Sequence, residues 1–348
     1  MKVGILTYHD GPNHGAYLQA LASVLLLRSW GHAVEIINYK NPRHKYLEEI
    51  RPWLVYRRPV RFLDHLRKHT VFREDRKIMP MSRRTHNPDT VKKLHYDAAI
   101  IGSDVVWNHK IFGYDDLYFG GLNADRLIAY APSCGWVNAH DSQPADLSKA
   151  FSRFSALSAR DENTRELIRI TTGQDAPLVL DPTLLTDFSE VERPARAPLF
   201  QKPYLLVYAY TMSASAAAEI RDYARENKLI TIATGYRQGW CDHNRMEVGP
   251  LAWLSLVRNA HTLATSTFHG MVFTLKYQTP FFFFSNAKAR HRVSSLAGLC
   301  GMESCLPETD GQLSSRTKPR DFLAAEKLES AADCSRTWLQ DQLSSKNP

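Results

Sequence analysis

Short apolar segments alternate with longer amphipathic segments along most of the chain. Residues 2–7 predict a buried strand, and residues 16–30 predict a helix that ends at Gly31. The alternation extends through the first half, with strands expected at residues 33–38, 96–101, 127–131, 154–158 and 177–180 and a helix at residues 162–170. Apolar strands that alternate with helices are typical of a parallel sheet covered on both faces.

The pattern restarts after residues 190–203, a segment rich in proline, arginine and alanine that is typical of a linker. The second half predicts strands at residues 204–210, 229–233, 261–264 and 280–284, helices at residues 215–227, 250–259 and after His269, and a last helix near residues 328–343. A chain of 348 residues also favours two cores over one. The expected fold class is therefore α/β, with two Rossmann-like domains facing a central cleft. Their expected bounds are residues 1–193 and 194–348, and the last helix can pack back on the first domain.

The net charge of +8 is concentrated in residues 41–93, which we expect to be an irregular insertion with one or two helices. Its many cations, Arg57, Arg58 and Arg61 among them, are interleaved with aromatic residues. Three interpretations are open: a face for nucleic acid, a patch for anionic lipid or a phosphorylated substrate, and a solvated helical surface. Because no nucleic-acid motif accompanies the charge, we expect no nucleic-acid partner. Peripheral contact with an anionic membrane remains an expectation.

No apolar run approaches the roughly 18 residues of a membrane span, and residues 1–7 become polar too quickly for a signal peptide. The five cysteines are scattered and include no CxxC pair, so the sequence indicates neither a disulfide framework nor a metal site. We expect a cytoplasmic protein, free or peripheral at the inner face of the membrane, without metal.

The segment from Thr265 to Gly270 places His269 between a predicted strand and a predicted helix. Open α/β sheets bind ligands at this position. Free backbone N–H groups at a helix start favour an anion, and an imidazole beside them can carry a proton. The alternative is a capped helix with a satisfied histidine. His269 is therefore a candidate catalytic residue, with Thr267 and Gly270 as candidate binding residues.

Further polar residues follow other predicted strands. Asn13 and Gly15 come after the first strand, where glycine lets the backbone approach a ligand and asparagine can cap a helix. This segment is not a GxGxxG, so no dinucleotide is indicated. Ser103 and Asp104 follow the strand at residues 96–101 and can cap a helix or touch a substrate hydroxyl. Ser133 lies in another strand-end loop of small residues.

Two arginines also lie at predicted strand ends. Arg160 follows the strand at residues 154–158, and a guanidinium can bind phosphate or carboxylate through two parallel hydrogen bonds. Its alternative partner is Asp161, at the start of a helix. Arg237 follows the strand at residues 229–233 and can supply a second cation. The turn that begins at Asp181 indicates a structural role, because Pro182 follows it.

In their order and spacing, six motifs together resemble the polysaccharide pyruvyl transferase family, and the resemblance covers about residues 1–300. The six motifs are Asn13–Gln19, Gly102–Asn108, Tyr130–Gly135, Ser158–Arg160, Asp181–Leu185 and Thr265–Gly270. The resemblance implies a fold similar to GT-B glycosyltransferases, with the site in the interdomain cleft.

The resemblance also implies transfer of a pyruvyl group from phosphoenolpyruvate onto two sugar hydroxyls of a glycan or lipid-linked saccharide, with formation of a ketal and release of phosphate. The family's histidine falls on His269, and its strand-end arginine falls on Arg160. One departure is that Ser266 replaces the acidic residue usual in the histidine motif, and Thr267 replaces its serine. No cofactor is expected beyond phosphoenolpyruvate as the donor substrate.

These residue types suit the implied chemistry. We predict His269 as the acid or as the group that stabilises the departing phosphate, and Asp104 as the group that holds or deprotonates the acceptor hydroxyl. The predicted substrate-binding residues are Arg160, Arg237, Asn13, Gly15, Ser103, Ser133, Thr267 and Gly270. Two alternatives are a nucleotide-sugar glycosyltransferase of the GT-B fold and a non-catalytic glycan-binding member of the family.

Overall fold

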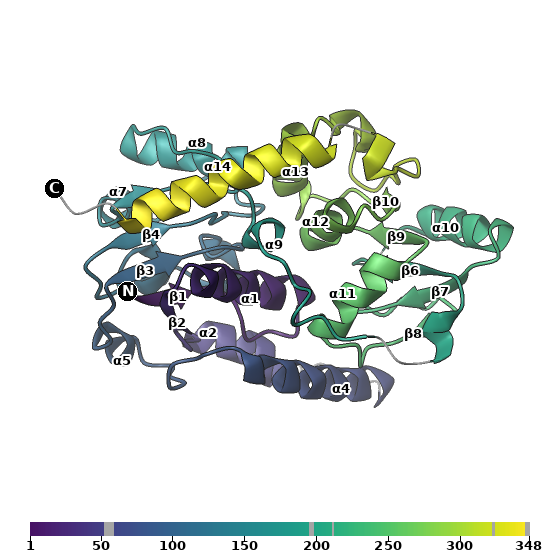
Figure 1. The fold of residues 1–348 in the computed structure, drawn as a ribbon, viewed down its shortest axis with the longest axis horizontal. Coiled ribbons are helices and arrows are strands. Elements are labelled where there is room, and N and C mark those ends of the chain that lie inside the picture. Colours follow the sequence, from purple (N-terminus) through teal and green to yellow (C-terminus); the bar gives the residue numbers. More distant parts are fainter. Residues whose placement is uncertain (52–58, 195–197, 211, 322–323, 345–348) are drawn as a thin grey trace.

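A computed structural model describes residues 1–51, 59–194, 198–210, 212–321 and 324–344 of the chain. Two parallel five-stranded sheets, one in each half, are covered by helices (Figure 1). This architecture confirms the predicted fold class, an α/β protein of two Rossmann-like domains with a GT-B-like arrangement. Among the described ranges, no helix is both long enough and apolar enough to cross a bilayer.

The first sheet has the strand order β2-β1-β3-β4-β5. Its strands are β1 (Lys2–Leu6), β2 (Ala33–Ile36), β3 (Ala98–Ile101), β4 (Leu127–Ala129) and β5 (Ala156–Leu157). In the central register, Ile5 of β1 pairs with Ile36 on one side and with Ile100 on the other. The chain therefore winds outward from β1 in one direction and from β3 in the other, and the order reverses between these two strands.

Eight helices belong to the described part of the first half. They are α1 (His14–Ser29), α2 (Pro42–Lys45), α4 (Pro59–Asp75), α5 (Pro88–Lys92), α6 (His109–Phe112), α7 (Leu147–Phe151), α8 (Glu162–Thr172) and α9 (Pro182–Leu185). A π-helical turn (Tyr46–Ile50) follows α2, and two 3₁₀ turns span Arg76–Ile78 and Asp116–Phe119. Helix α1 is apolar on all sides and almost wholly buried, as expected of a helix enclosed between two domains.

The second sheet repeats the plan with the strand order β10-β9-β6-β7-β8. Its strands are β6 (Tyr204–Tyr208), β7 (Ile230–Ala233), β8 (His243–Asn244), β9 (Thr262–Thr265) and β10 (Phe281–Phe283). The helices are α10 (Ala214–Glu226), α11 (Pro250–Asn259), α12 (Phe268–Tyr277), α13 (Arg290–Cys300) and α14 (Ala324–Ser344). Three 3₁₀ turns span Pro198–Gln201, Glu303–Cys305 and Pro319–Asp321. Here the order reverses between β6 and β9.

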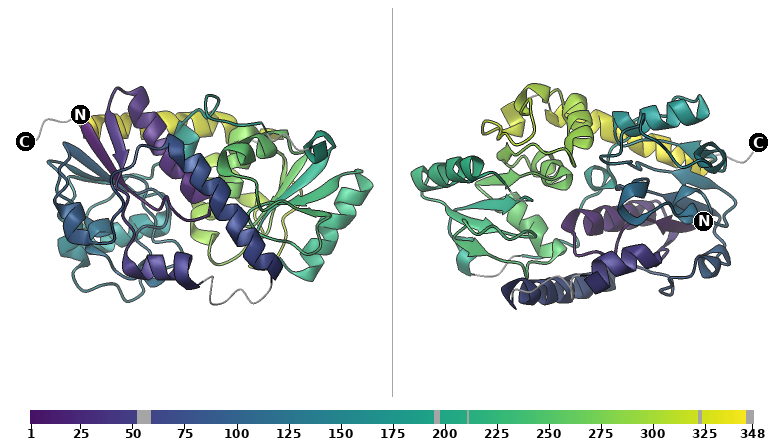
Figure 2. Two further views of the ribbon diagram at one scale, coloured as in Figure 1. Left: turned by 90° about the horizontal axis from the view of Figure 1, so that it is seen from below. Right: turned by 180° about the vertical axis from the view of Figure 1, so that it is seen from behind.

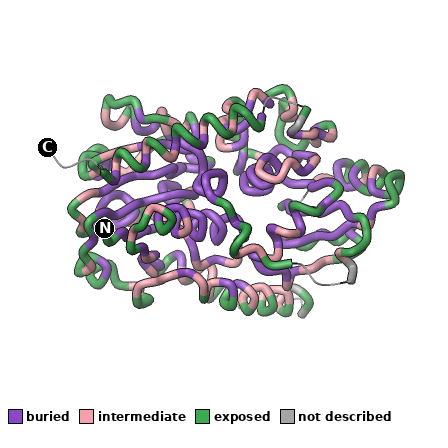
Figure 3. Tube along the Cα trace, in the orientation of Figure 1, coloured by how far each residue is buried: buried purple, intermediate pink, exposed green. Residues whose placement is uncertain are grey.

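One of three apolar clusters among the described residues spans both halves. Tyr17 of α1 and Phe72 of α4 belong to the same buried cluster as Tyr208 of β6 and Trp253 of α11. Figure 3 shows the two sheets and α1 as largely buried. Because burial of apolar surface is the main stabilising contribution, the halves are held together by packing as well as by the chain that connects them.

Helix α14 follows the second sheet in sequence but returns to the first half (Figure 1). The Arg126 guanidinium donates to the carbonyl oxygens of Gln342 and Leu343, at 2.8 and 2.9 Å. The Leu180 N–H donates to Ser335 Oγ at 3.0 Å. These bonds and the buried side chain of Leu343 attach the helix to the first half.

The basic insertion contains a helix of 17 residues, α4, that lies along both halves (Figure 2). Charges of the insertion are paired within the protein. Asp75, at the end of α4, accepts a bond of 2.7 Å from Arg193, and Arg76, directly after α4, contacts Asp10. Membrane contact by this segment stays a prediction, since Arg57 and Arg58 lie outside the described residues.

Several elements differ from the prediction. Residues 177–180 do not form a strand; they make one isolated bridge, between Leu178 and Ala159. The physical reason is that the Leu180 N–H bonds to Ser335 of α14 instead of a neighbouring strand. Strand β8 and helices α6, α7 and α13 are additional elements that we did not predict, and α9 forms where we predicted only a turn. The described part of the insertion holds three helices, α2, α4 and α5, instead of one or two.

Candidate active site

A cavity of about 330 Å³, here called the His269 cavity, opens where loops from the two sheets meet. Its lining includes Asn13 after β1, Asp104 after β3, Tyr208 at the end of β6, and His269 after β9. The order of the first sheet reverses between β1 and β3, and that of the second sheet reverses between β6 and β9. The four residues thus follow the strands at these two reversal points. Ligands of open α/β sheets bind at the carboxyl ends of strands at such points. The fold therefore brings two ligand-binding positions together at one cavity.

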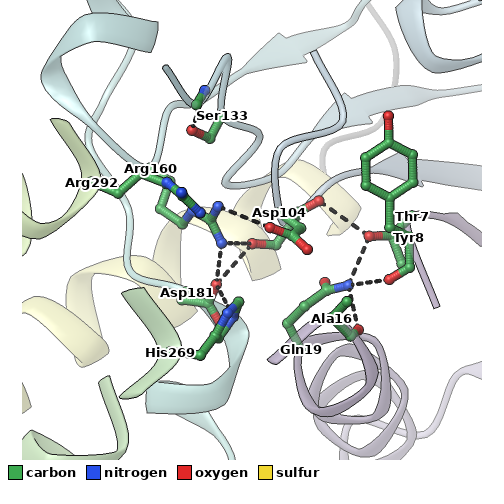
Figure 4. A network of polar contacts seen from close by, with 12 residues as sticks. Thr7, Tyr8, Ala16, Gln19, Asp104, Ser133, Arg160, Asp181, His269 and Arg292 are labelled. Atoms are coloured by element: carbon green, nitrogen blue, oxygen red, sulfur yellow. Dashed lines mark hydrogen bonds and ion pairs between the residues drawn. The ribbon is translucent and has the colours of Figure 1, made fainter. Parts of the chain in front are cut away.

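Hydrogen bonds hold the two loops of the first half in register (Figure 4). The Thr7 hydroxyl, at the end of β1, donates to the Ser103 carbonyl oxygen at 3.1 Å. Gln19 of α1 donates to Thr7 Oγ1 and to the Tyr8 carbonyl oxygen, both at 2.9 Å. Because these groups are buried and paired, the loop that carries Asp104 has a defined position beside the start of α1.

His269 is placed by the tight start of α12. Thr267 is the N-cap, and its Oγ1 accepts a hydrogen bond of 2.9 Å from the Gly270 N–H. A Cβ at position 270 would lie 1.9 Å from Thr265 Oγ1, so only glycine fits there. The predicted roles of Thr267 and Gly270 in binding stay predictions; the bonds observed here are those of a helix cap, and Thr267 also lines the cavity.

Asp181 is the centre of a buried polar network (Figure 4). Its Oδ2 lies 3.4 Å from His269 Nε2, 2.6 Å from Arg160 Nη1 and 3.1 Å from Ser103 Oγ. Its Oδ1 accepts bonds from the N–H and the hydroxyl of Thr183. The sequence indicated only the role of Oδ1, which caps the turn at the start of α9. The role of the Asp181 carboxylate opposite His269 is one that we did not identify from the sequence.

Opposing effects determine the charge of Asp181. Burial by itself raises the pKa of this carboxyl group. The positive charges of His269 and Arg160 oppose burial and hold the pKa of Asp181 well below its usual range. The residue is therefore a carboxylate at neutral pH, and it gives the His269 ring an anionic partner.

Arg160 lies behind the wall of the His269 cavity. Its side chain is 1% exposed, its Nη2 is 3.4 Å from Asp104 Oδ1, and its guanidinium stacks 4.5 Å from the centre of the Phe268 ring. Both terminal nitrogens thus face carboxylates of the protein. Direct binding of an anion by Arg160 stays a prediction, and the observed contacts suit the positioning of Asp104 and Asp181.

Arg292 and Lys288 are the basic side chains that line the His269 cavity, and the sequence analysis did not single them out. The Arg292 guanidinium donates to the Lys288 carbonyl oxygen at 2.6 Å, and its buried Nε has no hydrogen-bond partner among the described residues. Burial and the charge of Arg160 lower the pKa of Arg292. The apolar spacing of Val293, Leu296 and Cys300 is a helical signal that could have located α13 and therefore Arg292.

Asp104 and Ser103 adjoin each other but occupy different places. Asp104 lines the cavity and adopts a left-handed backbone conformation, with φ of 65°, that aspartate tolerates better than most residues. Ser103 is fully buried between Asp181 and Arg160. Ser133, also labelled in Figure 4, joins the loop of Asp104 through its backbone, since its N–H donates to the Asp104 carbonyl oxygen at 2.9 Å. Its hydroxyl instead donates to Asp161, the N-cap of α8, at 2.6 Å.

Asn13 and Gly15 position the start of α1 against the histidine. Asn13 lines the cavity, and its Oδ1 caps α1 by accepting a bond of 3.2 Å from the Ala16 N–H. A Cβ on Gly15 would lie 2.2 Å from His269 Nδ1. Gly15 is therefore required for the close approach of α1 to the His269 ring.

Arg237 is not brought to the His269 cavity. Its Nε and Nη2 bond to the carboxylate of Asp64 at 2.6 and 3.0 Å, and it lines a second, larger cavity. The strand after which it lies, β7, is next to β6 and away from the point where the strand order reverses. Arg237 therefore does not line the His269 cavity, and its role in substrate binding stays a prediction.

The missing acidic residue at position 266 does not leave His269 without a carboxylate. Ser266 Oγ accepts a hydrogen bond of 2.8 Å from the Tyr210 N–H and so joins the ends of β6 and β9. The carboxylate near His269 comes from Asp181, in the other half of the chain. Within the described residues, no group of three or more histidine, cysteine, aspartate or glutamate side chains is arranged to hold a metal ion.

Solved structures with a similar arrangement share little sequence with this chain. UDP-GlcNAc 2-epimerase from Methanocaldococcus jannaschii is 11% identical, with a TM-score of 0.49 over 100% of this chain and 94% of that one. Arabidopsis thaliana UGT89C1, complexed with UDP-L-rhamnose, is 11% identical, with a TM-score of 0.47 over 98% and 93%. Heptosyltransferase WaaC from E. coli, with ADP, is 11% identical, with a TM-score of 0.38 over 81% and 86%.

The sequence has no significant match among curated proteins. A family model described as polysaccharide pyruvyl transferase matches residues 13–288. The matched segment begins at Asn13 and ends at Lys288, both of which line the His269 cavity.

Proposed function

Because the chain belongs to the polysaccharide pyruvyl transferase family, we propose that it transfers the pyruvyl group of phosphoenolpyruvate onto sugar hydroxyls. The acceptor is a polysaccharide or a lipid-linked glycan precursor, and the products are a cyclic ketal and phosphate. The observation that carries this proposal is one cavity in which His269 and Asp104 lie together with two basic side chains.

The charges of the His269 cavity suit the donor. Phosphoenolpyruvate carries a phosphate and a carboxylate on three carbons, and the cavity offers Arg292, Lys288 and His269 to these anionic groups. A guanidinium binds either group through paired hydrogen bonds. A volume of about 330 Å³ is at the small end of the roughly 300–1,000 Å³ usual for ligand pockets, which suits a small donor and one sugar ring.

The reaction requires two proton gains and two proton losses at substrate atoms. In the first step, the terminal vinyl carbon gains a proton from His269 and the central carbon becomes oxocarbenium-like. A sugar hydroxyl oxygen bonds to that central carbon, and its proton passes to Asp104. In the second step, a second hydroxyl bonds to the same carbon, the bond from that carbon to the phosphate oxygen breaks, and phosphate departs. The proton held by Asp104 passes to the departing phosphate, which restores Asp104, and the proton from the second hydroxyl restores His269.

Asp181 and Arg160 act as positioning residues in this scheme. Asp181 faces His269 Nε2, and Arg160 faces both Asp181 and Asp104. A fixed anion orients the imidazole and stabilises its protonated form without itself transferring the proton. The two predicted catalytic residues are thus connected through one buried guanidinium.

The first test is phosphate release from phosphoenolpyruvate, with and without a panel of glycosyl acceptors. We expect acceptor-dependent release by the wild type and a loss of roughly a hundredfold or more in kcat for His269→Ala and Asp104→Asn. Unchanged turnover in His269→Ala would reject the assigned role. If no acceptor elicits release and phosphoenolpyruvate gives no thermal protection, while a uridine diphosphate sugar does, the protein uses a nucleotide-sugar donor instead.

Arg292→Lys tests the donor site, and Arg237→Lys is its matched control. The first change keeps the charge but removes the paired geometry, so we expect the KM for phosphoenolpyruvate to rise about tenfold. Arg237 lines the other cavity and pairs with Asp64, so the same change there should leave this KM unchanged.

A further inference from the structure

A second cavity, here called the α4 cavity, has a volume of about 1100 Å³ and lies between α4 and loops of the second half. From α4 it is lined by Val60, Asp64 and Lys68, and from the opposite side by Tyr210, Tyr236 and Gly239, among others. Its volume is at or above the upper end of the usual range of roughly 300–1,000 Å³ for ligand pockets. A three-carbon donor leaves most of this space empty.

The α4 cavity adjoins the His269 cavity. Tyr210, Tyr236 and Lys288 line both, so a ligand longer than one sugar ring can extend from one into the other. The two tyrosine rings are 4.6 Å apart between their centres and form an aromatic wall at the junction. Lys288 Nζ lies 5.9 Å from the centre of the Tyr210 ring.

Two cations of the α4 cavity, Lys68 and Arg237, already have partners in the protein. The ammonium of Lys288, at the junction with the His269 cavity, contacts only the Tyr210 ring among the described residues. The Lys68 ammonium donates to the Gly235 carbonyl oxygen at 2.7 Å and lies 5.2 Å from the centre of the Tyr236 ring. Burial lowers the pKa of Lys68 to about 8. Arg237 is paired with Asp64 through two bonds. A diphosphate would have to compete with these interactions, whereas an uncharged ligand would not.

The remaining lining suits a hydroxyl-rich, uncharged ligand. Tyrosine presents an apolar ring face and a polar hydroxyl, and Tyr210 is 39% exposed. The C–H faces of a sugar ring can pack on such a ring. Asn286, Gln238 and Asp64 also line the cavity. Their side chains bond within the protein to Ser266, Ala209 and Arg237, and their remaining oxygen lone pairs can accept hydrogen bonds from sugar hydroxyls.

From this combination we infer that the α4 cavity binds the units of a neutral oligosaccharide acceptor that precede the sugar to be modified. The reacting sugar then lies in the His269 cavity, and the rest of the chain passes Tyr210 and Tyr236 towards α4. This inference rests on the proposed function and deepens it, because it makes the protein selective for acceptors of several units. Helix α4, part of the basic insertion, is thereby a substrate-binding element.

Gly239→Trp is the sharpest test. Gly239 lines the α4 cavity but not the His269 cavity, and a Cβ added there meets no heavy atom within 4 Å, so a large side chain can enter the cavity without displacing the fold. The probes are methyl glycosides and matched oligosaccharides of two to four units of galactose, glucose or mannose, with phosphoenolpyruvate as donor. Ser148→Trp, an exposed change on α7, is the control.

We expect the wild type to have a KM for tetrasaccharides at least tenfold below that for the monosaccharide glycosides. Gly239→Trp should abolish this difference, while the KM for phosphoenolpyruvate and turnover of the monosaccharide glycosides stay unchanged. Ser148→Trp should behave as the wild type. A preference for long acceptors that survives in Gly239→Trp, or no such preference in the wild type, overturns the inference and leaves the proposed function intact.

Direct binding separates failure of the inference from failure of the proposed function. If no variant releases phosphate, saturation-transfer NMR with the tetrasaccharides decides whether the wild type binds them and Gly239→Trp does not. Binding of that kind supports the cavity assignment even where pyruvyl transfer is refuted. Binding of uridine diphosphate that Gly239→Trp removes would instead assign the α4 cavity to a nucleotide and overturn the inference.

Discussion

Asp181 Oδ2 lies 3.4 Å from His269 Nε2, and the two side chains come from opposite halves of the chain. Asp181 is fixed at the start of α9 in the first half, and His269 belongs to α12 in the second. Their contact means that the histidine acquires its carboxylate partner only when the two halves pack together. The integrity of the domain interface is therefore a condition for the proposed chemistry.

Asp181→Asn removes one negative charge with little change of shape. Arg160 is then left buried with Asp104 as its remaining carboxylate, at 3.4 Å, so we expect a loss of about 3–5 kcal/mol in the free energy of unfolding. We also expect kcat to fall by roughly a hundredfold, because His269 loses its orienting anion. Urea unfolding and phosphate release measure the two effects. Asp187→Asn, at an exposed position, is the control and should match the wild type in kcat.

The same pair gives a pH prediction. The pKa of Asp181 is lower in the folded protein than the value of about 3.9 for an unfolded chain, so the unfolded state takes up the proton first on acidification. The contribution of Asp181 to stability is thus complete above about pH 5 and declines as the pH falls below about 4. Urea unfolding between pH 6 and pH 3 should therefore show a narrowing difference between wild type and Asp181→Asn. A constant difference would contradict the assigned charge.

Gly15→Ala tests the contact of α1 with the histidine. The added methyl group would lie 2.2 Å from His269 Nδ1, so the ring or the helix must move. We expect a loss of about 1–3 kcal/mol in the free energy of unfolding and a fall in kcat. Gly298→Ala, in a helix where the added Cβ would make only an ordinary contact of 3.7 Å with Glu303 Oε1, should instead be neutral or stabilise by up to about 1 kcal/mol. Wild-type activity in Gly15→Ala would show that the His269 ring tolerates displacement.

Because His14 is buried, we expect the folded protein to lose stability in mild acid. The residue is fully buried at the domain interface, where its Nε2 donates to the Val248 carbonyl oxygen at 3.0 Å, and burial lowers its pKa to about 3. The unfolded chain binds a proton near pH 6.5 and the folded chain does not, so this contribution is lost as the pH falls from about 6.5 towards 3. One such histidine changes the free energy of unfolding by up to about 1.4 kcal/mol per pH unit.

His14→Gln retains a donor for Val248 but cannot titrate. Urea unfolding at pH 7, 6, 5 and 4 gives the free energy of unfolding at each pH. This free energy should fall less steeply with decreasing pH in His14→Gln than in the wild type, because unfolding of the variant takes up about one proton fewer. An equal slope in the two proteins would mean that His14 does not remain neutral in the folded state. His9, whose pKa burial lowers to about 4, should contribute to the residual slope of the variant.

Residue pattern predicted most of the elements that have apolar periodicity, although it missed α13 and wrongly gave a strand at residues 177–180. Apart from β8, the strands of both sheets and the helix after His269 follow from apolar runs, because a buried parallel strand consists of little else. Strand β8 has two polar residues and carries no such signal. Its existence depends on the register with β7, where Ile232 pairs with His243.

The candidate site was predictable in part for a related reason. His269 and Asp104 stand at strand ends, which sequence can locate, and they line one cavity. Asp181 was not identified, because a capping aspartate before proline has an adequate local explanation. One of its oxygens does fulfil that local role with Thr183, and only the other reaches Arg160 and His269. A contact between distant segments has no local signature.

Arg237 illustrates the opposite case. A guanidinium at a strand end is suitable for an anion, and that much was visible in the sequence. Asp64, its actual partner, lies in an insertion with no fixed spacing to the strand, so the pairing depends on how α4 packs across the second half. The same packing creates the α4 cavity.

The return of α14 to the first half has a consequence for biosynthesis. The ribosome completes β1 to β5 long before residue 324 is made, yet the Arg126 guanidinium and the Leu180 N–H bond to that last helix, and the Tyr130 ring packs against its Trp338. The first domain therefore leaves the exit tunnel with an uncovered surface, which it must keep from aggregating while the whole second domain is translated. Deletion of the final helix would damage the domain made first, and a protease that cut between the two sheets would not release an intact half.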